Sequence, residues 1–198
     1  NALVTAGRLV PGETVLIQGA SSGVGLMAMQ IAKEKGARMV IGTSTNAARR
    51  AKLAEYGADL ALDSSDPGWA DAVLAATDGK GVDLVIDQVS GGVMNDNLKA
   101  TRILGRIVNV GRLGGFSGDF NFDLHAFKRI DYIGVTFRSR SPQEVRDIVT
   151  AARGDLWDAV EAGRLHLPID RTFSLDEAAA AQEHMRRNGH FGKIVLTV

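Results

Sequence analysis

A glycine-rich segment, Gly23-Val24-Gly25-Leu26-Met27-Ala28, carries the spacing G-x-G-x-x-A. Residues without side chains let the backbone come close to phosphate oxygens, and the first turn of a helix offers free N–H groups and a partial positive charge. These features could hold the pyrophosphate of a dinucleotide. The same pattern also fits a tight turn between a strand and a helix, packed closely at Ala28, so the motif alone leaves both interpretations open.

The residues around the motif give it the context that phosphate binding needs. The apolar run Thr14–Ile17 precedes it and predicts a buried strand, and a helical pattern follows from Val24. Ser21 and Ser22 stand just before the first glycine. Their hydroxyls could donate to a phosphate or satisfy the turn itself, and the sequence does not separate these two roles.

Apolar runs and helical patterns alternate over most of the chain. Strands are predicted at Val15–Ile17, Met39–Ile41, Leu60–Leu62, Asp83–Asp87, Arg106–Val110 and Tyr132–Phe137. The predicted helices between them run from the cap Asn46 to about Tyr56, over Pro67–Thr77 behind the cap Asp66, and over Val93–Ala100. Strands that are apolar throughout imply a parallel sheet covered on both faces. Right-handed crossovers then predict an α/β doubly wound sheet of Rossmann type in the order 3-2-1-4-5-6, with ligands at its carboxyl edge.

After Arg140 the pattern changes. We predict a helix from Ser141, a second helix over Leu156–Ala162, an extended segment over Ile169–Phe173, a helix over Leu175–Arg187 and a last strand over Lys193–Val198. Residues 171–198 are not expected to complete a sheet of their own. The predicted division is a dinucleotide-binding domain over residues 1–140 and a C-terminal segment over residues 141–198 that rejoins another part of a larger protein.

Composition narrows the possible functions. The 198 residues include 23 Lys and Arg against 23 Asp and Glu, which gives no reason to expect nucleic acid or an anionic membrane as a partner. Cysteine is absent, which excludes disulfides, thiolate zinc ligands and a cysteine nucleophile. The four histidines lack metal-ligand spacing, so no metal site is predicted. Without a long apolar run or a signal peptide, the expected location is the cytoplasm.

Several segments together resemble the medium-chain dehydrogenase/reductase superfamily, in its quinone oxidoreductase-like branch. They are Val15–Gly25, Gln30–Lys33, Tyr56–Asp59, Gly81–Asp83, Gly105-Arg106, Val110-Gly111 and Gly192–Leu196. The resemblance implies the cofactor domain of an enzyme whose barrel-like catalytic domain comes earlier, so we expect a fragment. It also implies hydride transfer from NADPH to a quinone or another activated double bond. Several members hold zinc in the first domain and the quinone-reductase branch does not, and this sequence leaves that choice open.

The predicted end of the second strand points to the type of nicotinamide cofactor. NAD-preferring folds carry Asp or Glu there to bind the ribose hydroxyls, whereas this chain has Thr43 and Ser44 and no acid. The absence of a carboxylate permits the 2′-phosphate of NADP(H). Arg49 and Arg50 follow within reach, and arginine binds phosphate well; by resemblance Arg49 replaces a phosphate-binding lysine. The alternative is that both arginines are solvated helix residues.

The resemblance implies further cofactor contacts at strand ends: Ser64 where the family usually has a tyrosine, Val89, Val110, Gly111 and Phe137. With Ser21, Ser22, Gly23, Val24, Gly25, Thr43, Ser44 and Arg49, these are the predicted cofactor-binding residues. Asp87 is interpreted as a structural acid in preference to a ribose ligand, and Asn109 as a strand-end hydrogen bonder. No side chain qualifies as a proton donor, so no catalytic residue is assigned.

Three other functions share part of this sequence pattern. Short-chain dehydrogenases share the glycine motif but need Tyr-x-x-x-Lys, and Tyr56 and Tyr132 are followed at that spacing by Leu60 and Thr136. An enoyl-reductase module of a polyketide synthase remains open. So does a non-catalytic module for NADPH binding or dimerisation. The apolar edge strand, taken as Asp131–Phe137, predicts a homodimer by strand pairing.

Overall fold

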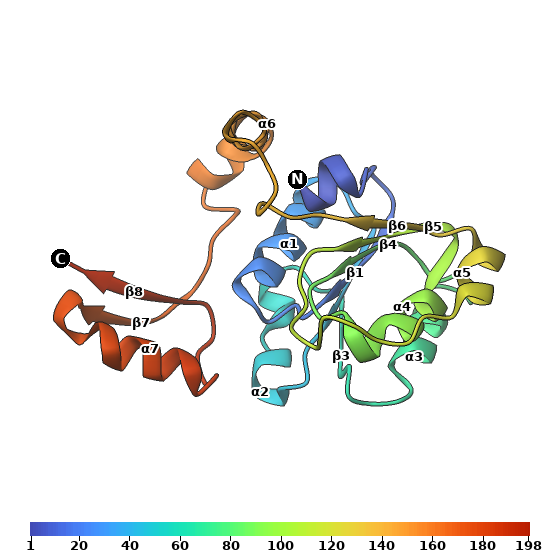
Figure 1. The fold of residues 1–198 in the computed structure, drawn as a ribbon, viewed down its shortest axis with the longest axis horizontal. Coiled ribbons are helices and arrows are strands. Elements are labelled where there is room, and N and C mark those ends of the chain that lie inside the picture. Colours follow the sequence, from blue (N-terminus) through green and yellow to red (C-terminus); the bar gives the residue numbers. More distant parts are fainter.

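Six parallel strands form the central sheet in the order β3-β2-β1-β4-β5-β6 (Figure 1). The computed structural model describes residues 1–198. The strands are β1 (Thr14–Gln18), β2 (Met39–Thr43), β3 (Leu60–Leu62), β4 (Val82–Asp87), β5 (Thr101–Asn109) and β6 (Asp131–Gly134). This confirms the predicted doubly wound α/β sheet and its strand order.

Helices cover both faces of the sheet. They are η1 (Ala2–Ala6), α1 (Gly23–Glu34), α2 (Ala47–Arg50), η2 (Leu53–Tyr56), α3 (Trp69–Ala76), η3 (Gly91–Val93), α4 (Met94–Ala100) and α5 (Phe122–Lys128). Successive residues of a strand point to opposite faces. Val15 and Ile17 of β1 accordingly join the core beneath α1, while Leu16 joins a second core beneath α3 and α4.

Two predicted helices have different bounds in the structure. The helix expected from Asn46 to Tyr56 divides into α2 and η2, and this places Leu53 and Tyr56 in the core. Helix α3 begins only at Trp69, because the Asp66 carboxylate accepts from the N–H of Gly68 (2.8 Å) in a turn instead of capping the helix. Helices η1 and α5 were not predicted.

The edge strand β6 ends at Gly134, which corrects the predicted ends at Phe137. The neighbouring strand β5 ends at Asn109, which is the residue paired with Gly134. The N–H of Val135 still donates to the Asn109 carbonyl (3.0 Å). Beyond that bond β5 offers no backbone to continue the ladder, so the residues up to Phe137 leave the sheet and enter a loop.

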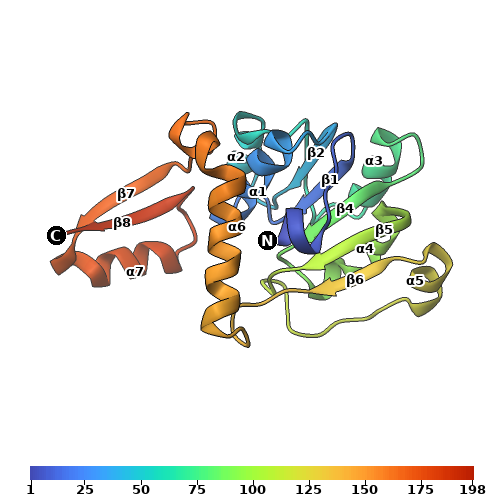
Figure 2. The same ribbon diagram turned by 90° about the horizontal axis from the view of Figure 1, so that it is seen from above.

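The C-terminal part differs most from the prediction. Helix α6 (Pro142–Glu161) is one continuous helix of 20 residues, not two, and it runs through Gly154. Ser141 and Glu144 cap it reciprocally. Strands β7 (Ile169–Ser174) and β8 (Lys193–Thr197) pair in parallel as a separate two-stranded sheet, with η4 (Leu175–Glu177) and α7 (Ala178–Arg186) between them. Residues 169–197 therefore form a small sheet with one helix, called here the C-terminal unit, which projects beside α1 and α6 (Figure 2). Residues 171–198 make up most of this unit.

Candidate cofactor site

The glycine loop presents unpaired backbone donors at the start of α1. The N–H of Gly25 donates to Ser22 Oγ (3.0 Å), which makes Ser22 the N-cap of the helix. The N–H groups of Gly23 and Val24 make no hydrogen bond within the protein. They stand at the positive end of a 12-residue helix. This is the arrangement that binds an anionic group.

Close packing explains the second glycine of the motif. A Cβ on Gly25 would lie 2.6 Å from the Ala20 Cα and 2.6 Å from the carbonyl oxygens of Gly19 and Ala20. Helix α1 can therefore approach the end of β1 only because this residue has no side chain. Gly25 is thus explained by close packing at the turn, whereas the unpaired N–H groups of Gly23 and Val24 support binding of an anion.

The hydroxyls near the loop have mixed roles. Ser22 Oγ donates to Gln88 Oε1 (2.9 Å) besides capping α1, so the hydrogen of this hydroxyl already has a partner within the protein. Ser21 Oγ accepts from Ser44 Oγ (2.9 Å) and keeps its own hydrogen to donate. Thr43 is fully buried, and its hydroxyl donates to Gln18 Oε1 (2.6 Å). Ser21 is therefore the hydroxyl still able to donate to a ligand.

Lys193, which the sequence analysis did not propose, lies over the glycine loop. A Cβ on Gly23 would lie 3.1 Å from Lys193 Nζ, so the ammonium lies against Gly23, the first residue of α1. Lys193 opens β8, and its own N–H donates to the Pro168 carbonyl (2.8 Å). Gly192 has φ +99°, and a Cβ there would lie 2.1 Å from the same carbonyl. Because Gly23 and Lys193 are 170 positions apart in the chain, no spacing rule could have joined them.

The two arginines after β2 have different partners. Arg50 Nη1 donates to the Ser44 carbonyl (2.7 Å) and to Asp63 Oδ2 (3.0 Å), so a carboxylate balances its charge. Arg49 donates to both the side-chain and the main-chain oxygen of Asn188, which are uncharged. The end of β2 carries no acid. Ser64 is half-buried just beyond β3, near this end of the site.

A mostly apolar groove of about 920 Å³ extends from the glycine loop along α1 and α6. Of the predicted cofactor residues it brings together Gly23, Val24, Val110 and Phe137, and it adds Lys193. Arg112 and Arg138 also line it. The remaining predicted residues lie outside this groove: Ser21, Ser22, Gly25, Thr43, Ser44, Arg49, Ser64, Val89 and Gly111.

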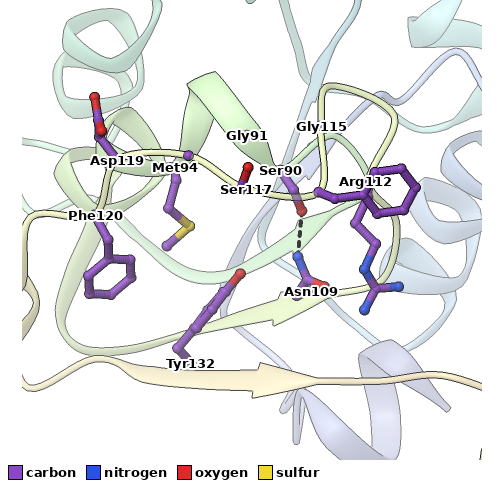
Figure 3. Close-up of a pocket in the computed structure, with 12 residues that line it drawn as sticks. Ser90, Gly91, Met94, Asn109, Arg112, Gly115, Ser117, Asp119, Phe120 and Tyr132 are labelled. Carbon is purple, nitrogen blue, oxygen red and sulfur yellow. Dashed lines mark hydrogen bonds between the residues drawn. The ribbon is translucent and has the colours of Figure 1, made fainter.

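Hydrogen bonds join the loops that follow β4 and β5. Ser90, at φ +57°, donates through Oγ to the Gly111 carbonyl (2.8 Å) and accepts from Asn109 (Figure 3). A Cβ on Gly111 would lie 2.6 Å from the Gln88 carbonyl, so Gly111 packs against backbone there. A smaller pocket of about 190 Å³ is lined by Ser90 and Asn109, and the Tyr132 ring points into it.

Asp87 is a structural acid. It is fully buried and accepts from the N–H groups of Val89 (2.8 Å) and Ser90 (2.9 Å) and from Asn97 Nδ2 (3.1 Å). Burial raises the pKa of Asp87, and these three donors offset part of that increase. Since its oxygens hold the loop after β4, the side chain orders the edge of the site.

The described residues do not supply a metal centre. No three His, Cys, Asp or Glu side chains come together in a group able to hold an ion. None of the helices combines the length and the apolar character needed to cross a bilayer. A dinucleotide fits the residues present better than a metal does, because the loop offers free N–H donors and a lysine instead of metal ligands.

Fold and loop together define a dinucleotide-binding domain of Rossmann type. The comparisons with known proteins agree with this class: the family described as zinc-binding dehydrogenase matches residues 23–153. The chain belongs to this family, within the medium-chain dehydrogenase/reductase superfamily, as the sequence resemblance indicated. Such a domain implies a nicotinamide cofactor. The zinc of the family name has no ligand set among the residues of this chain.

Relatives include long synthases and shorter reductases. The phthioceranic/hydroxyphthioceranic acid synthase of Mycobacterium tuberculosis is 32% identical over 195 residues, which are 96% of this chain and 9% of the synthase. A 2-haloacrylate reductase structure matches 99% of this chain and 61% of its own, with 28% identity and a TM-score of 0.86. A quinone oxidoreductase of Pseudomonas syringae matches 99% and 60%, with 28% identity and a TM-score of 0.82. The chain thus spans only part of each relative.

Proposed function

We propose that this chain is the NADPH-binding part of a reductase that transfers hydride to an activated carbon–carbon double bond. The observation that carries the proposal is the ammonium of Lys193 against Gly23, at the end of α1 where the N–H groups of Gly23 and Val24 are unpaired. Two kinds of positive group meet there, at the place where a Rossmann fold holds a pyrophosphate. The carboxylate-free end of β2 and the uncompensated charge of Arg49 support NADP(H) over NAD(H).

The residues of this chain would bind and orient the cofactor. NADPH supplies the hydride when it is bound. The N–H groups of Gly23 and Val24 and the Lys193 ammonium would neutralise the pyrophosphate, and Arg49 would bind the 2′-phosphate. Val110 and Phe137 line the apolar groove, so they would exclude water from the end where the hydride is transferred. No proton donor is assigned within this chain.

The proposed class of hydride acceptor is inferred from the relatives. A 2-haloacrylate carries an activated double bond, and that reductase has the same cofactor-domain fold as this chain. A phenolphthiocerol/phthiocerol polyketide synthase subunit of Mycobacterium tuberculosis, 31% identical over 202 residues, supports a second candidate, an enoyl-reductase module within a polyketide synthase. A quinone is the third acceptor in this set. All three accept hydride at a conjugated centre, so one cofactor domain can serve each of them.

A homodimer through β6 belongs to the same proposal. Strand β6 pairs with β5 along one side only, and its other edge offers unpaired backbone groups. The pairing segment is Asp131–Gly134, shorter than predicted. Sedimentation of the full chain would test it, and a monomer at micromolar concentration would count against it.

We propose the cytoplasm as the location, since the balanced charge gives no attraction to an anionic surface.

Calorimetric titration of the full chain with NADPH and NADH tests the function. We expect both to bind and NADPH to bind more tightly. Lys193→Met keeps the side-chain length, removes the charge and should weaken both cofactors about tenfold, as expected on losing one charge-assisted contact. The exposed Lys80 gives the matched control Lys80→Met. If parent and Lys193→Met bind the two cofactors equally, the pyrophosphate assignment is wrong.

A further inference from the structure

Arg49 is held by a residue that lies 139 positions away in the chain. Its Nη1 donates to Asn188 Oδ1 (3.1 Å), and its Nη2 donates to the main-chain carbonyl of the same asparagine. Arg49 forms no ion pair, whereas the neighbouring Arg50 is paired with Asp63. The Arg49 guanidinium is therefore fixed in place by neutral acceptors and keeps its full charge.

The backbone at Asn188 makes this double contact possible. Asn188 follows α7 with φ +50°, and its N–H donates to the Met185 carbonyl (2.9 Å). Asparagine tolerates this left-handed conformation better than most residues do, and it commonly ends helices there. In this turn the side-chain amide oxygen and the main-chain oxygen both face Arg49. Asn188, in the C-terminal unit, thus accepts hydrogen bonds from both terminal nitrogens of the Arg49 guanidinium.

We propose that Asn188 is a positioning residue that orients Arg49 toward the 2′-phosphate of the cofactor. A guanidinium carries five N–H donors in one plane, so two bonds to Asn188 fix that plane and leave donors for a phosphate. Holding the side chain in advance also reduces the entropy lost when the ligand binds. This inference rests on the proposed NADPH function, and it makes the C-terminal unit part of the choice between NADPH and NADH.

A purely structural role for Asn188 predicts a different result from the same variants. If Asn188 only ends α7, then Asn188→Gly keeps the left-handed turn and should change nothing. If Asn188 positions Arg49, the same change removes one acceptor and loosens the arginine. Asn188→Asp keeps the shape and the turn but places a carboxylate on Arg49, which neutralises the charge that a phosphate needs.

The test measures binding of 2′,5′-ADP and 5′-AMP to the full chain, because the two probes differ only in the 2′-phosphate. Asn188→Asp should weaken 2′,5′-ADP about tenfold, and Asn188→Gly about threefold, while both bind 5′-AMP as the parent does. Thermal unfolding of each variant reports on the turn. Unchanged binding of 2′,5′-ADP by Asn188→Asp would overturn the proposal, and so would an equal loss for both probes.

Arg49→Ala separates this inference from the proposed function. If Arg49→Ala leaves the preference for 2′,5′-ADP over 5′-AMP unchanged, the assignment of the 2′-phosphate to Arg49 is itself wrong. If Arg49→Ala removes the preference but Asn188→Asp preserves it, then the function stands and Asn188 has no positioning role. A chain that binds neither probe would refute the proposed NADPH site.

Discussion

Lys193 Nζ lies 3.1 Å from the point that a Cβ on Gly23 would occupy. The contact joins the first residue of the last strand to the first residue of α1. An ammonium so placed adds a full charge to the partial charge of the helix end. The small C-terminal sheet therefore contributes directly to the candidate pyrophosphate site, and its position relative to the large sheet matters for binding.

Alanine at the two motif glycines should separate binding from folding. A Cβ on Gly23 meets only the flexible end of Lys193, so Gly23→Ala should change the free energy of unfolding by less than about 0.5 kcal/mol and weaken NADPH binding. A Cβ on Gly25 meets backbone at 2.6 Å, so Gly25→Ala should cost about 1–3 kcal/mol. Urea unfolding and calorimetry measure the two effects. Equal stabilities of the two variants would contradict the packing role of Gly25.

The two arginines should respond differently to substitution. Arg49→Ala should weaken NADPH by roughly 1–3 kcal/mol and leave NADH unchanged, because only NADPH carries the 2′-phosphate. Arg50→Ala is the matched control: it removes bonds to Ser44 and Asp63, so it should lower stability without changing the preference between the cofactors. A selective loss of NADPH in Arg50→Ala instead would reverse the two assignments.

Salt should weaken cofactor binding through Lys193 and Arg49. Ionic screening acts over about 8 Å at 0.15 M salt, and Lys193 is exposed while Arg49 is half-buried. NADPH affinity should therefore fall from 0.05 to about 0.5 M sodium chloride, and it should fall less in Lys193→Met. Titrations at several salt concentrations measure both slopes. Parallel slopes for parent and variant would mean that Lys193 does not interact with the cofactor.

The C-terminal unit should lose stability in acid. Asp170 accepts from His184 (2.7 Å) and from the N–H of Phe191 (3.0 Å), and these bonds lower the pKa of Asp170. The pKa of Asp170 is lower in the folded state than in the unfolded chain, where it has the ordinary value of 3.8. Its carboxylate therefore stabilises the fold at pH values above 3.8, and this contribution is lost as the pH falls through the lowered pKa. Asp170→Asn should therefore be less stable than the parent at pH 6, and the difference should shrink toward pH 3. A constant difference would rule out this linkage.

Local patterns were sufficient for the large sheet. Its strands are buried apolar runs between helices, and the right-handed crossover rule leaves few orders to choose from. Patterns were less reliable at element ends. Two helices were predicted where α6 is continuous through Gly154, and β6 stops at Gly134 because its neighbour β5 ends. Such bounds depend on partners that lie elsewhere in the chain.

The sequence by itself determined the order of the elements, the glycine loop and the absence of an acid after β2, because each depends on residues close together in the chain. The tertiary structure decided which charges meet that loop. Lys193 reaches Gly23, and Asn188 rather than solvent holds Arg49, across separations of 170 and 139 residues. Contacts over such distances follow from how the C-terminal residues lie against α1 and α2, and no periodicity in the sequence encodes them.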